Sequence, residues 1–331
     1  MANSSSSELK EKARGVNPST IRWILGAIGF GAFSLVVIAI GGPKMEFPLK
    51  LGNEVGKGID ASIRWATING AFLLDPISEG VLRFLLVIKD FFLWLPWPIL
   101  ILGVVLATLK IAGRGVAIFA LVSLMIMGLL GLWASAMETV ALIVVAVSLS
   151  VGIAVPVGIF AARSNRVDAV LRPILDAMQT MPSFVYLVPA VMFFGIGDVP
   201  AIFATIIYAV PPAIRLTNLG IRQVSAETVE AAMSFGTTPR QLLLKVQIPM
   251  AVPTIMAGIN QTIMMALAMV VIASLVGAGG LGEDVNRALN RFEPGKALLG
   301  GLGIVFLAII IDRVTQAAAK ERQRALMGEG E

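Results

Sequence analysis

The most constraining feature of this sequence is a series of long apolar stretches without a charged residue. A helix needs about 20 mostly apolar residues to cross a bilayer, and a backbone in lipid must satisfy its own hydrogen bonds. The stretches therefore predict an all-α protein, a polytopic transmembrane helix bundle of about eight spans. Composition agrees, because only 14% of the residues are charged, against about 25% in soluble domains. The predicted spans are residues 23–42, 93–109, 116–133, 139–162, 181–196, 199–214, 252–275 and 298–311.

Five of the segments outside these spans each carry two to four lysine or arginine residues. Basic segments tend to stay on the cytoplasmic side of the membrane. With eight spans, these five segments fall on the same side, so both termini are predicted to be cytoplasmic. The residues that set this orientation are Lys10, Lys12, Arg14 and Arg22, then Lys110 and Arg114, then Arg163, Arg166 and Arg172, then Arg215, Arg222, Arg240 and Lys245, and finally Arg313, Lys320, Arg322 and Arg324.

The spans divide the chain into six parts. The first span lacks an Ala-x-Ala-like cleavage site and is longer than a signal-peptide core, so it is predicted to be an anchor. The segment after it alternates apolar and polar residues at helical spacing, which is typical of helices on a membrane surface. It is interpreted as a membrane-surface brace, with a receptor for a partner protein as the alternative. The parts are a cytoplasmic N-terminal tail (1–22), the anchor (23–42), an external amphipathic segment (43–92), accessory spans (93–133), a core domain (139–316) with a cytoplasmic loop (215–249), and a cytoplasmic C-terminal tail (317–331).

The absence of cysteine and histidine from the sequence excludes disulfides, the usual zinc sites and Ser-His-Asp triads. No catalytic residue, metal site or cofactor is therefore expected. The pattern G-x-G-x-x-G occurs at residues 277–282, but it follows a membrane span instead of a strand, so a turning loop is expected there. No Walker A motif occurs, so this chain is not expected to bind ATP through such a motif.

The cytoplasmic loop carries strong local signals for two short helices. Ser225 is a good N-cap for a helix over residues 226–235, and Gly236 fits the left-handed position that ends it. A second helix is expected to start at Pro239, since proline is favoured in the first turn. Pro249 is expected to end this second helix before the next span.

At these residues the chain resembles a known family. Glu230-Ala-Ala, three residues, Gly236, nine residues, and an apolar-x-apolar-Pro ending at Pro249 reproduce the EAA loop of ABC-importer permeases. The resemblance implies a core like that of type I ABC importers, with a loop that docks into a groove on a separate ATPase. Glu230 would pair there with an arginine of the ATPase. The residues predicted to couple to the ATPase are Glu230, Ala231, Ala232, Gly236 and Pro249.

Four further stretches are similar to the glycine betaine/proline betaine (ProW-type) permeases: residues 176–189, 194–200, 211–215 and 255–261. The resemblance covers roughly residues 65–295. It implies a multi-pass permease in the bacterial inner membrane that imports a quaternary amine, such as glycine betaine, proline betaine or choline. The implied partners are two copies of a cassette ATPase, a periplasmic or lipid-anchored binding protein, and a second copy of the permease.

Residues for the solute path follow from the chemistry of a quaternary amine, whose diffuse charge suits aromatic faces and weakly polar walls. Polar side chains at membrane depth line a cavity or join helices by hydrogen bonds, and both interpretations stay open for residues 260–262. The residues predicted to line the path are Tyr186, Phe193, Phe194, Tyr208, Asn260 and Gln261.

Three other functions are possible for a helical membrane protein. A stand-alone secondary transporter or channel would hold ionisable residues within its spans, and these spans hold almost none. A membrane-embedded enzyme lacks the usual catalytic residues here. An ABC permease for another solute, such as the amino acid methionine, remains open because the EAA loop is shared among such permeases.

Overall fold

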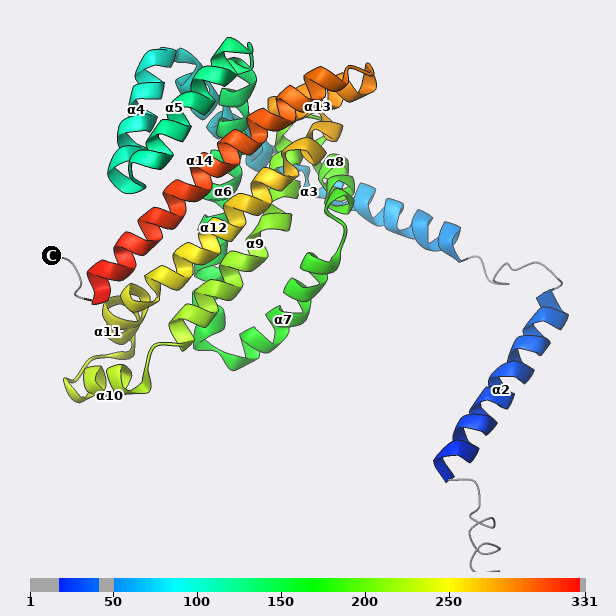
Figure 1. Ribbon diagram of the computed structural model, residues 1–331. Coiled ribbons are helices and arrows are strands. Elements are labelled where there is room, and N and C mark those ends of the chain that lie inside the picture. The colour runs from blue at the N-terminus through cyan, green and yellow to red at the C-terminus, as the bar shows by residue number, and fades with distance from the viewer. Residues whose placement is uncertain (1–17, 42–50, 328–331) are drawn as a thin grey trace, which may run out of the picture. The chain divides into compact units, whose positions relative to one another are not determined.

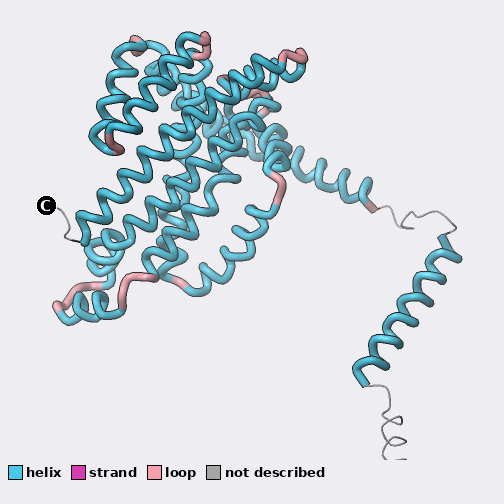
Figure 2. Tube along the Cα trace, in the orientation of Figure 1, coloured by secondary structure: helices cyan, strands magenta, loops and turns pink. Residues whose placement is uncertain are grey.

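The computed structural model describes residues 18–41 and 51–327, and every regular element within them is helical (Figures 1 and 2). The chain divides into two compact units, Met1–Ser62 and Ile63–Glu331. The first unit contains α2 (Pro18–Gly41) and the start of α3 (Gly52–Trp94). In α2 the large side chains of Trp23 and Phe30 are exposed, as expected of a helix that faces lipid.

Four helices in the described residues are long and apolar enough to cross a membrane, and two bent pairs bring the count to six. The first bent pair is α3 with α4 (Trp97–Ile111), and the second is α7 (Asn165–Thr180) with the segment Ser183–Phe194 that contains α8 (Leu187–Phe194). The apolar part of α2 and helix α5 (Arg114–Leu129) are shorter. The all-helical membrane fold is thus confirmed, with four to six candidate spans. The four long helices are α6 (Trp133–Arg163), α9 (Asp198–Arg222), the continuous helix Pro239–Val276 that contains α12 (Ile248–Ala273), and α14 (Pro294–Met327), whose apolar part is Pro294–Lys320.

The predicted span 181–196 is wrong as a single straight helix. Helix α7 ends at Thr180, and Met181 is extended, with φ −68° and ψ 138°, as a residue before proline prefers. A short 3₁₀ turn and α8 follow, at an angle of 109° to α7. The first half of this bent pair was missed because α7 is amphipathic and carries charges such as Asp168 and Asp176, which a search for charge-free stretches rejects.

Two helix ends also differ from the prediction. Helix α9 continues to Arg222, beyond the predicted end at residue 214, because a helix does not stop where charges begin. Pro249 does not end a helix. It lies in the continuous helix Pro239–Val276, just after a π-helical turn, Leu243–Gln247, in which the Ile248 N–H donates to the Leu243 carbonyl. A π turn changes the local backbone pairing, which lets the helix accommodate a proline that lacks an N–H.

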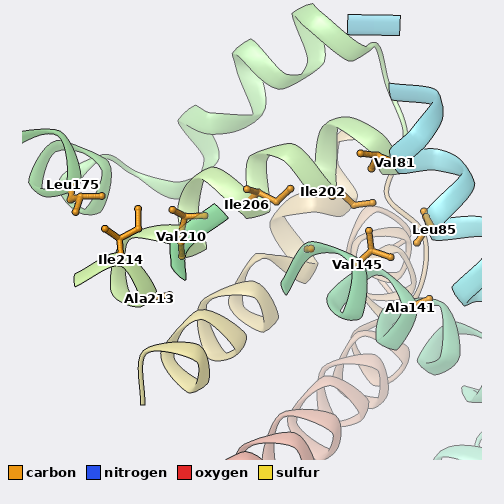
Figure 3. Close-up of a cluster of buried hydrophobic side chains, with 12 residues drawn as sticks. Val81, Leu85, Ala141, Val145, Leu175, Ile202, Ile206, Val210, Ala213 and Ile214 are labelled. Atoms are coloured by element: carbon orange, nitrogen blue, oxygen red, sulfur yellow. The ribbon is translucent and has the colours of Figure 1, made fainter. Parts of the chain in front are cut away.

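Helices α6, α9 and α12 form the centre of the second unit. Figure 3 shows part of its core, in which Val145 of α6 and Ile206 and Val210 of α9 lie in one buried cluster. The helices approach closely at glycines: a Cβ on Gly158 would lie 2.6 Å from the Cβ of Thr217, and one on Gly258 would lie 2.9 Å from Leu216. Small residues at helix interfaces are the usual way in which membrane helices pack.

Helices α4 and α5 pack against α14, where Phe119 and Phe306 meet edge to face at 6.1 Å between ring centroids. The two ends of the bundle, seen in Figure 1, are named here by their connecting helices. The coupling end carries α10 (Ala226–Ser234) and α11 (Pro239–Leu242), between α9 and α12. The opposite end carries α13 (Leu281–Asn290), between α12 and α14.

The glycine-rich loop at residues 277–282 is a turn that ties the opposite end together. The Leu281 N–H donates to Thr139 Oγ1 at 2.8 Å, and the Gly279 N–H donates to Asp198 Oδ1 at 3.0 Å. Gly280 has φ 86°, and a Cβ on it would lie 2.4 Å from Thr139 Oγ1. The expected turning loop is therefore confirmed, and the glycines serve close packing against α6 and α9.

Candidate coupling loop and solute pathway

The loop at the coupling end forms because its local signals agree. The Ser225 hydroxyl caps α10 by accepting from the Thr228 N–H at 3.3 Å, and Gly236 follows the helix with φ 79°. Helix α11 begins with a capping box, in which the Thr238 hydroxyl accepts from the Gln241 N–H and the Gln241 side chain accepts from the Thr238 N–H. The structure thus confirms the short first helix, the turn at Gly236 and the start of the second helix at Pro239, but the second helix is not short, because it continues to Val276.

Helix α10 is mostly exposed. None of its residues is buried; Glu230 and Ala231 are exposed and Ala232 is half-buried. Two apolar side chains at its end, Met233 and Phe235, are 58% and 90% exposed. The residues around the end of α10 thus leave both a charge and apolar surface accessible.

The coupling loop is attached to the bundle mainly through α12. The Thr237 hydroxyl donates to the Ala232 carbonyl at 2.8 Å, which joins α10 to the start of the next helix. Leu243 is buried against Ile221, Ala251 and Ile255. Since α11 continues through the π turn into α12, a displacement of the loop acts directly on a membrane-spanning helix. Pro249, the last predicted coupling residue, is half-buried within that helix.

A polar network beside the loop was not anticipated from the sequence. Asp168 of α7, only 6% exposed, accepts from Arg172 at 2.5 Å and from Asn218 at 2.7 Å. Arg222 donates to Asn165 and to the Ala161 carbonyl, each at 2.7 Å. The network joins the ends of α6, α7 and α9. The sequence places arginines here, but it holds no local signal for partners that are about 50 residues apart.

The structure brings the predicted aromatic residues together in two pairs. The rings of Tyr186 and Tyr208 are 6.4 Å apart, and the Tyr186 hydroxyl donates to the Met178 carbonyl at 2.5 Å. Phe194 stacks on Phe203 of α9 at 4.1 Å, and Phe193 lies 6.4 Å from Phe194. Tyr186 is 5% exposed and belongs to the core of the chain, whereas the other predicted aromatic residues are half-buried.

The polar residues of α12 serve two purposes. Asn260 donates to Asp312 of α14 at 3.1 Å and accepts from Thr315. Thr262 donates to the Ala209 carbonyl of α9 at 2.8 Å. Asn260 and Thr262 therefore join helices by hydrogen bonds, which is one of the two interpretations left open for residues 260–262. Gln261 points away from these contacts and is exposed.

Comparison with known proteins defines the class of this chain. The family model of the binding-protein-dependent transport system inner membrane component matches residues 154–323, about half of the sequence. The chain belongs to this family: it is a multi-pass inner-membrane permease component of a binding-protein-dependent transport system. The matched region includes the coupling loop and α6, α9, α12 and α14 in whole or in part.

Individual relatives cover more of the chain. It is 48% identical over 273 residues to the glycine betaine/proline betaine transport system permease protein ProW of Escherichia coli, covering 82% of this chain and 76% of that protein. It is 50% identical over 242 residues to the glycine betaine/carnitine transport permease protein GbuB of Listeria monocytogenes, covering 71% and 86%. It is 44% identical over 260 residues to the glycine betaine transport system permease protein OpuAB of Bacillus subtilis, covering 78% and 92%. The predicted resemblance to ProW-type permeases is confirmed.

A solved structure shares the fold. The MetNI methionine ABC transporter in an inward-facing conformation matches with a TM-score of 0.51 and 22% identity, over 59% of this chain and 95% of the matched chain. The likeness confirms a permease-like arrangement of helices.

Proposed function

We propose that this chain is the membrane-spanning subunit of an ATP-driven importer for a quaternary amine, such as glycine betaine, proline betaine or choline. The observation that carries the proposal is α10, a well-capped helix with no buried residue that presents Glu230 and two exposed apolar side chains. Such a helix suits the groove of an ATPase subunit. The solute class is supported by the relatives, whose names specify glycine betaine, proline betaine and carnitine.

The complete importer would contain two copies of this chain, two copies of the cassette ATPase, and a binding protein on the outer side. Each α10 would occupy one ATPase, with Ala231 and Ala232 allowing close approach and Glu230 paired with an arginine of the ATPase. Breaking a desolvated charge pair costs about 2–5 kcal/mol, so Glu230 would contribute strongly to the contact. Closure of the ATPases on ATP would then move α10 and, through α11, the spanning helix α12.

We further propose eight crossings, counting each bent pair once and including the shorter helices α2 and α5. With this count, Arg163, Arg222 and Arg240 lie at the coupling end, and this end is cytoplasmic by the distribution of basic residues. Residues 1–22 and 317–331 would be cytoplasmic tails. In the first bent pair, α4 would cross the membrane, and α3 would lie on the outer membrane surface as most of the segment 43–92. Residues 1–17, 42–50 and 328–331 of these parts lie outside the described residues. The accessory spans 93–133 would flank the permease core at 139–316.

Single cysteines test this topology, because the chain contains none of its own. Thr237→Cys in the coupling loop should react with a membrane-impermeant thiol reagent only from the cytoplasmic side. Asn286→Cys in α13 should react only from outside. Equal labelling of both from outside would rule out the eight-crossing arrangement.

The solute path would run where two copies meet. Four predicted residues keep accessible surface for this role: Phe193, Phe194, Tyr208 and Gln261. Tyr186 and Asn260 would support the path from behind, through the Tyr208 ring and through α14. Aromatic faces attract a quaternary ammonium by about 0.5–2 kcal/mol, which favours passage without tight retention.

The function is tested by uptake into right-side-out vesicles that contain the complete importer and ATP. Labelled glycine betaine, choline and methionine are supplied through the binding protein. Accumulation of a quaternary amine, abolished without ATP, is the expected result. Accumulation of methionine alone would refute the solute class and keep the permease function, and ATP-independent uptake of any solute would refute the proposal as a whole.

A further inference from the structure

A groove of about 320 Å³ lies between α7 and α9 near the coupling end. The two helices are joined by polar contacts, and Figure 1 shows that α7 stands apart from the central helices. Apolar side chains line the groove, and Figure 3 shows two of them, Leu175 of α7 and Ile214 of α9, close together in the core cluster. Leu171 and Leu219 also line it, as do Asp176 and Arg215.

Two ion pairs connect α7 to α9 around this groove, and they differ in exposure. At its base, the Asp168 side chain is 9% exposed and is held by several donors. Further along, Arg215 donates to Asp176 at 2.6 Å, and these side chains are 40% and 65% exposed. The base is therefore a fixed structural contact, whereas each member of the Asp176–Arg215 pair has surface left for another ligand.

Arg215 lies within α9, a candidate membrane span, and not in the loop 215–249 where the sequence placed it; Asp176 lies in α7, half of a bent pair. Arg215 precedes the end of α9 at Arg222 by about 10 Å along the helix axis. A charged side chain that faces lipid inside a span costs about 2.5–3.5 kcal/mol. Exposed charges at such a position are typical of a water-filled cavity, so the groove is interpreted as an aqueous recess that opens toward the coupling end.

We infer that this groove is a transit site for a zwitterion that carries a quaternary ammonium and a carboxylate. The inference rests on the proposed function. It adds a binding site within the chain and a physical reason why the importer would select zwitterions over simple cations. The Arg215 guanidinium would donate to the solute carboxylate, a geometry in which arginine is favoured. The Asp176 carboxylate would attract the ammonium by charge alone, since a quaternary ammonium has no N–H to donate. Leu171 and Leu219 would contact its methyl groups.

The geometry suits passage better than storage. An exposed ion pair contributes only about 0–1 kcal/mol to stability. The Asp176–Arg215 pair can therefore open at little cost, and each side chain can then pair with the opposite charge of the zwitterion. Charge balance is kept, because one negative and one positive group enter together. A site on a transport route must bind its solute and then release it, and this exchange meets both needs.

The test uses the complete importer in inside-out vesicles, so that the coupling end faces the medium. Leu219→Cys in the groove and Arg166→Cys outside it are the only cysteines in their variants, and Arg166 is exposed. Each is labelled with a membrane-impermeant thiol reagent in the presence of glycine betaine, choline or sucrose. We expect glycine betaine to slow labelling of Leu219→Cys by about threefold or more as it saturates the site, with no effect on Arg166→Cys.

In a variant that combines Leu219→Cys with Arg215→Gln, glycine betaine should no longer slow the labelling of the cysteine. A role for the ion pair in packing alone would leave labelling insensitive to glycine betaine in both variants, so solute protection separates binding from packing. Protection by choline equal to that by glycine betaine would overturn the role of Arg215.

Right-side-out vesicles from the same preparation measure uptake. No protection in a preparation that imports glycine betaine would overturn the transit site and keep the proposed function. Protection in a preparation that imports no quaternary amine would overturn the proposed function and keep the groove as a zwitterion site.

Discussion

Two short helices connect spans of this chain, and they differ in what they contact. Helix α10 joins α9 to α12 and has no buried residue. Helix α13 joins α12 to α14 and buries Leu281, Gly282, Val285 and Ala288. Both helices have similar lengths and lie next to a glycine with positive φ. The difference teaches that α13 completes the fold of its own chain, whereas α10 stays accessible and is the helix that we propose to contact the ATPase.

The largest expected effect comes from a methyl group at the glycine beside α13. Gly280→Ala should lower the free energy of unfolding by about 4 kcal/mol. The added Cβ would lie 2.4 Å from Thr139 Oγ1 and 3.0 Å from the Ser135 carbonyl, and the positive φ of this residue disfavours any side chain. Purified protein should unfold at much lower temperature or fail to accumulate. The matched control is Gly236→Ala beside α10, where φ is also positive and no atom lies within 4 Å of the added Cβ. It should cost only about 1 kcal/mol, and equal losses in the two variants would remove the contrast between the helices.

A second prediction concerns the free helix. Glu230→Ala should weaken association with the ATPase by about 2 kcal/mol or more and reduce uptake at least tenfold, while the thermal stability of the isolated permease stays the same. Co-purification of the ATPase and vesicle uptake measure the two effects. Glu227→Gln on the same helix is the control, because Glu227 is also exposed but lies outside the coupling motif. Normal uptake by Glu230→Ala would show that α10 is not the coupling element.

A smaller loss is expected at the hydrogen bond that holds α13. Thr139→Val keeps the shape of the side chain but leaves the buried Leu281 N–H without its acceptor, which should cost about 1–3 kcal/mol. Thermal unfolding in detergent is the measurement. Ser148→Ala, at an exposed position of the same helix, should change stability by less than about 0.5 kcal/mol. A stable Thr139→Val variant would mean that this hydrogen bond contributes little to holding α13.

The coupling loop was predictable because its signals are local. Ser225, Gly236 and Pro239 each act on the few residues beside them, and the structure places each in the expected role. The bend between α7 and α8 was not predicted, since the charges along α7 hid the first half of the bent pair. The Asp168 network and the Asp176–Arg215 pair join residues far apart in sequence, and no local rule assigns such partners. Asn260 shows the same limit, because its contact with Asp312 depends on how α12 and α14 are rotated.

The continuous helix Pro239–Val276 reaches from the coupling end of the bundle to the opposite end. Its 38 residues correspond to about 57 Å of helix, longer than a bilayer core of about 30 Å. At the far end, the Val276 carbonyl accepts from the Gly197 N–H at 2.8 Å, beside the turn that holds α13. The helix is thus a lever: a tilt of about 5° would displace one end against the other by about 5 Å. If an ATPase docks on α10 as proposed, a small movement there would displace the opposite end of this helix.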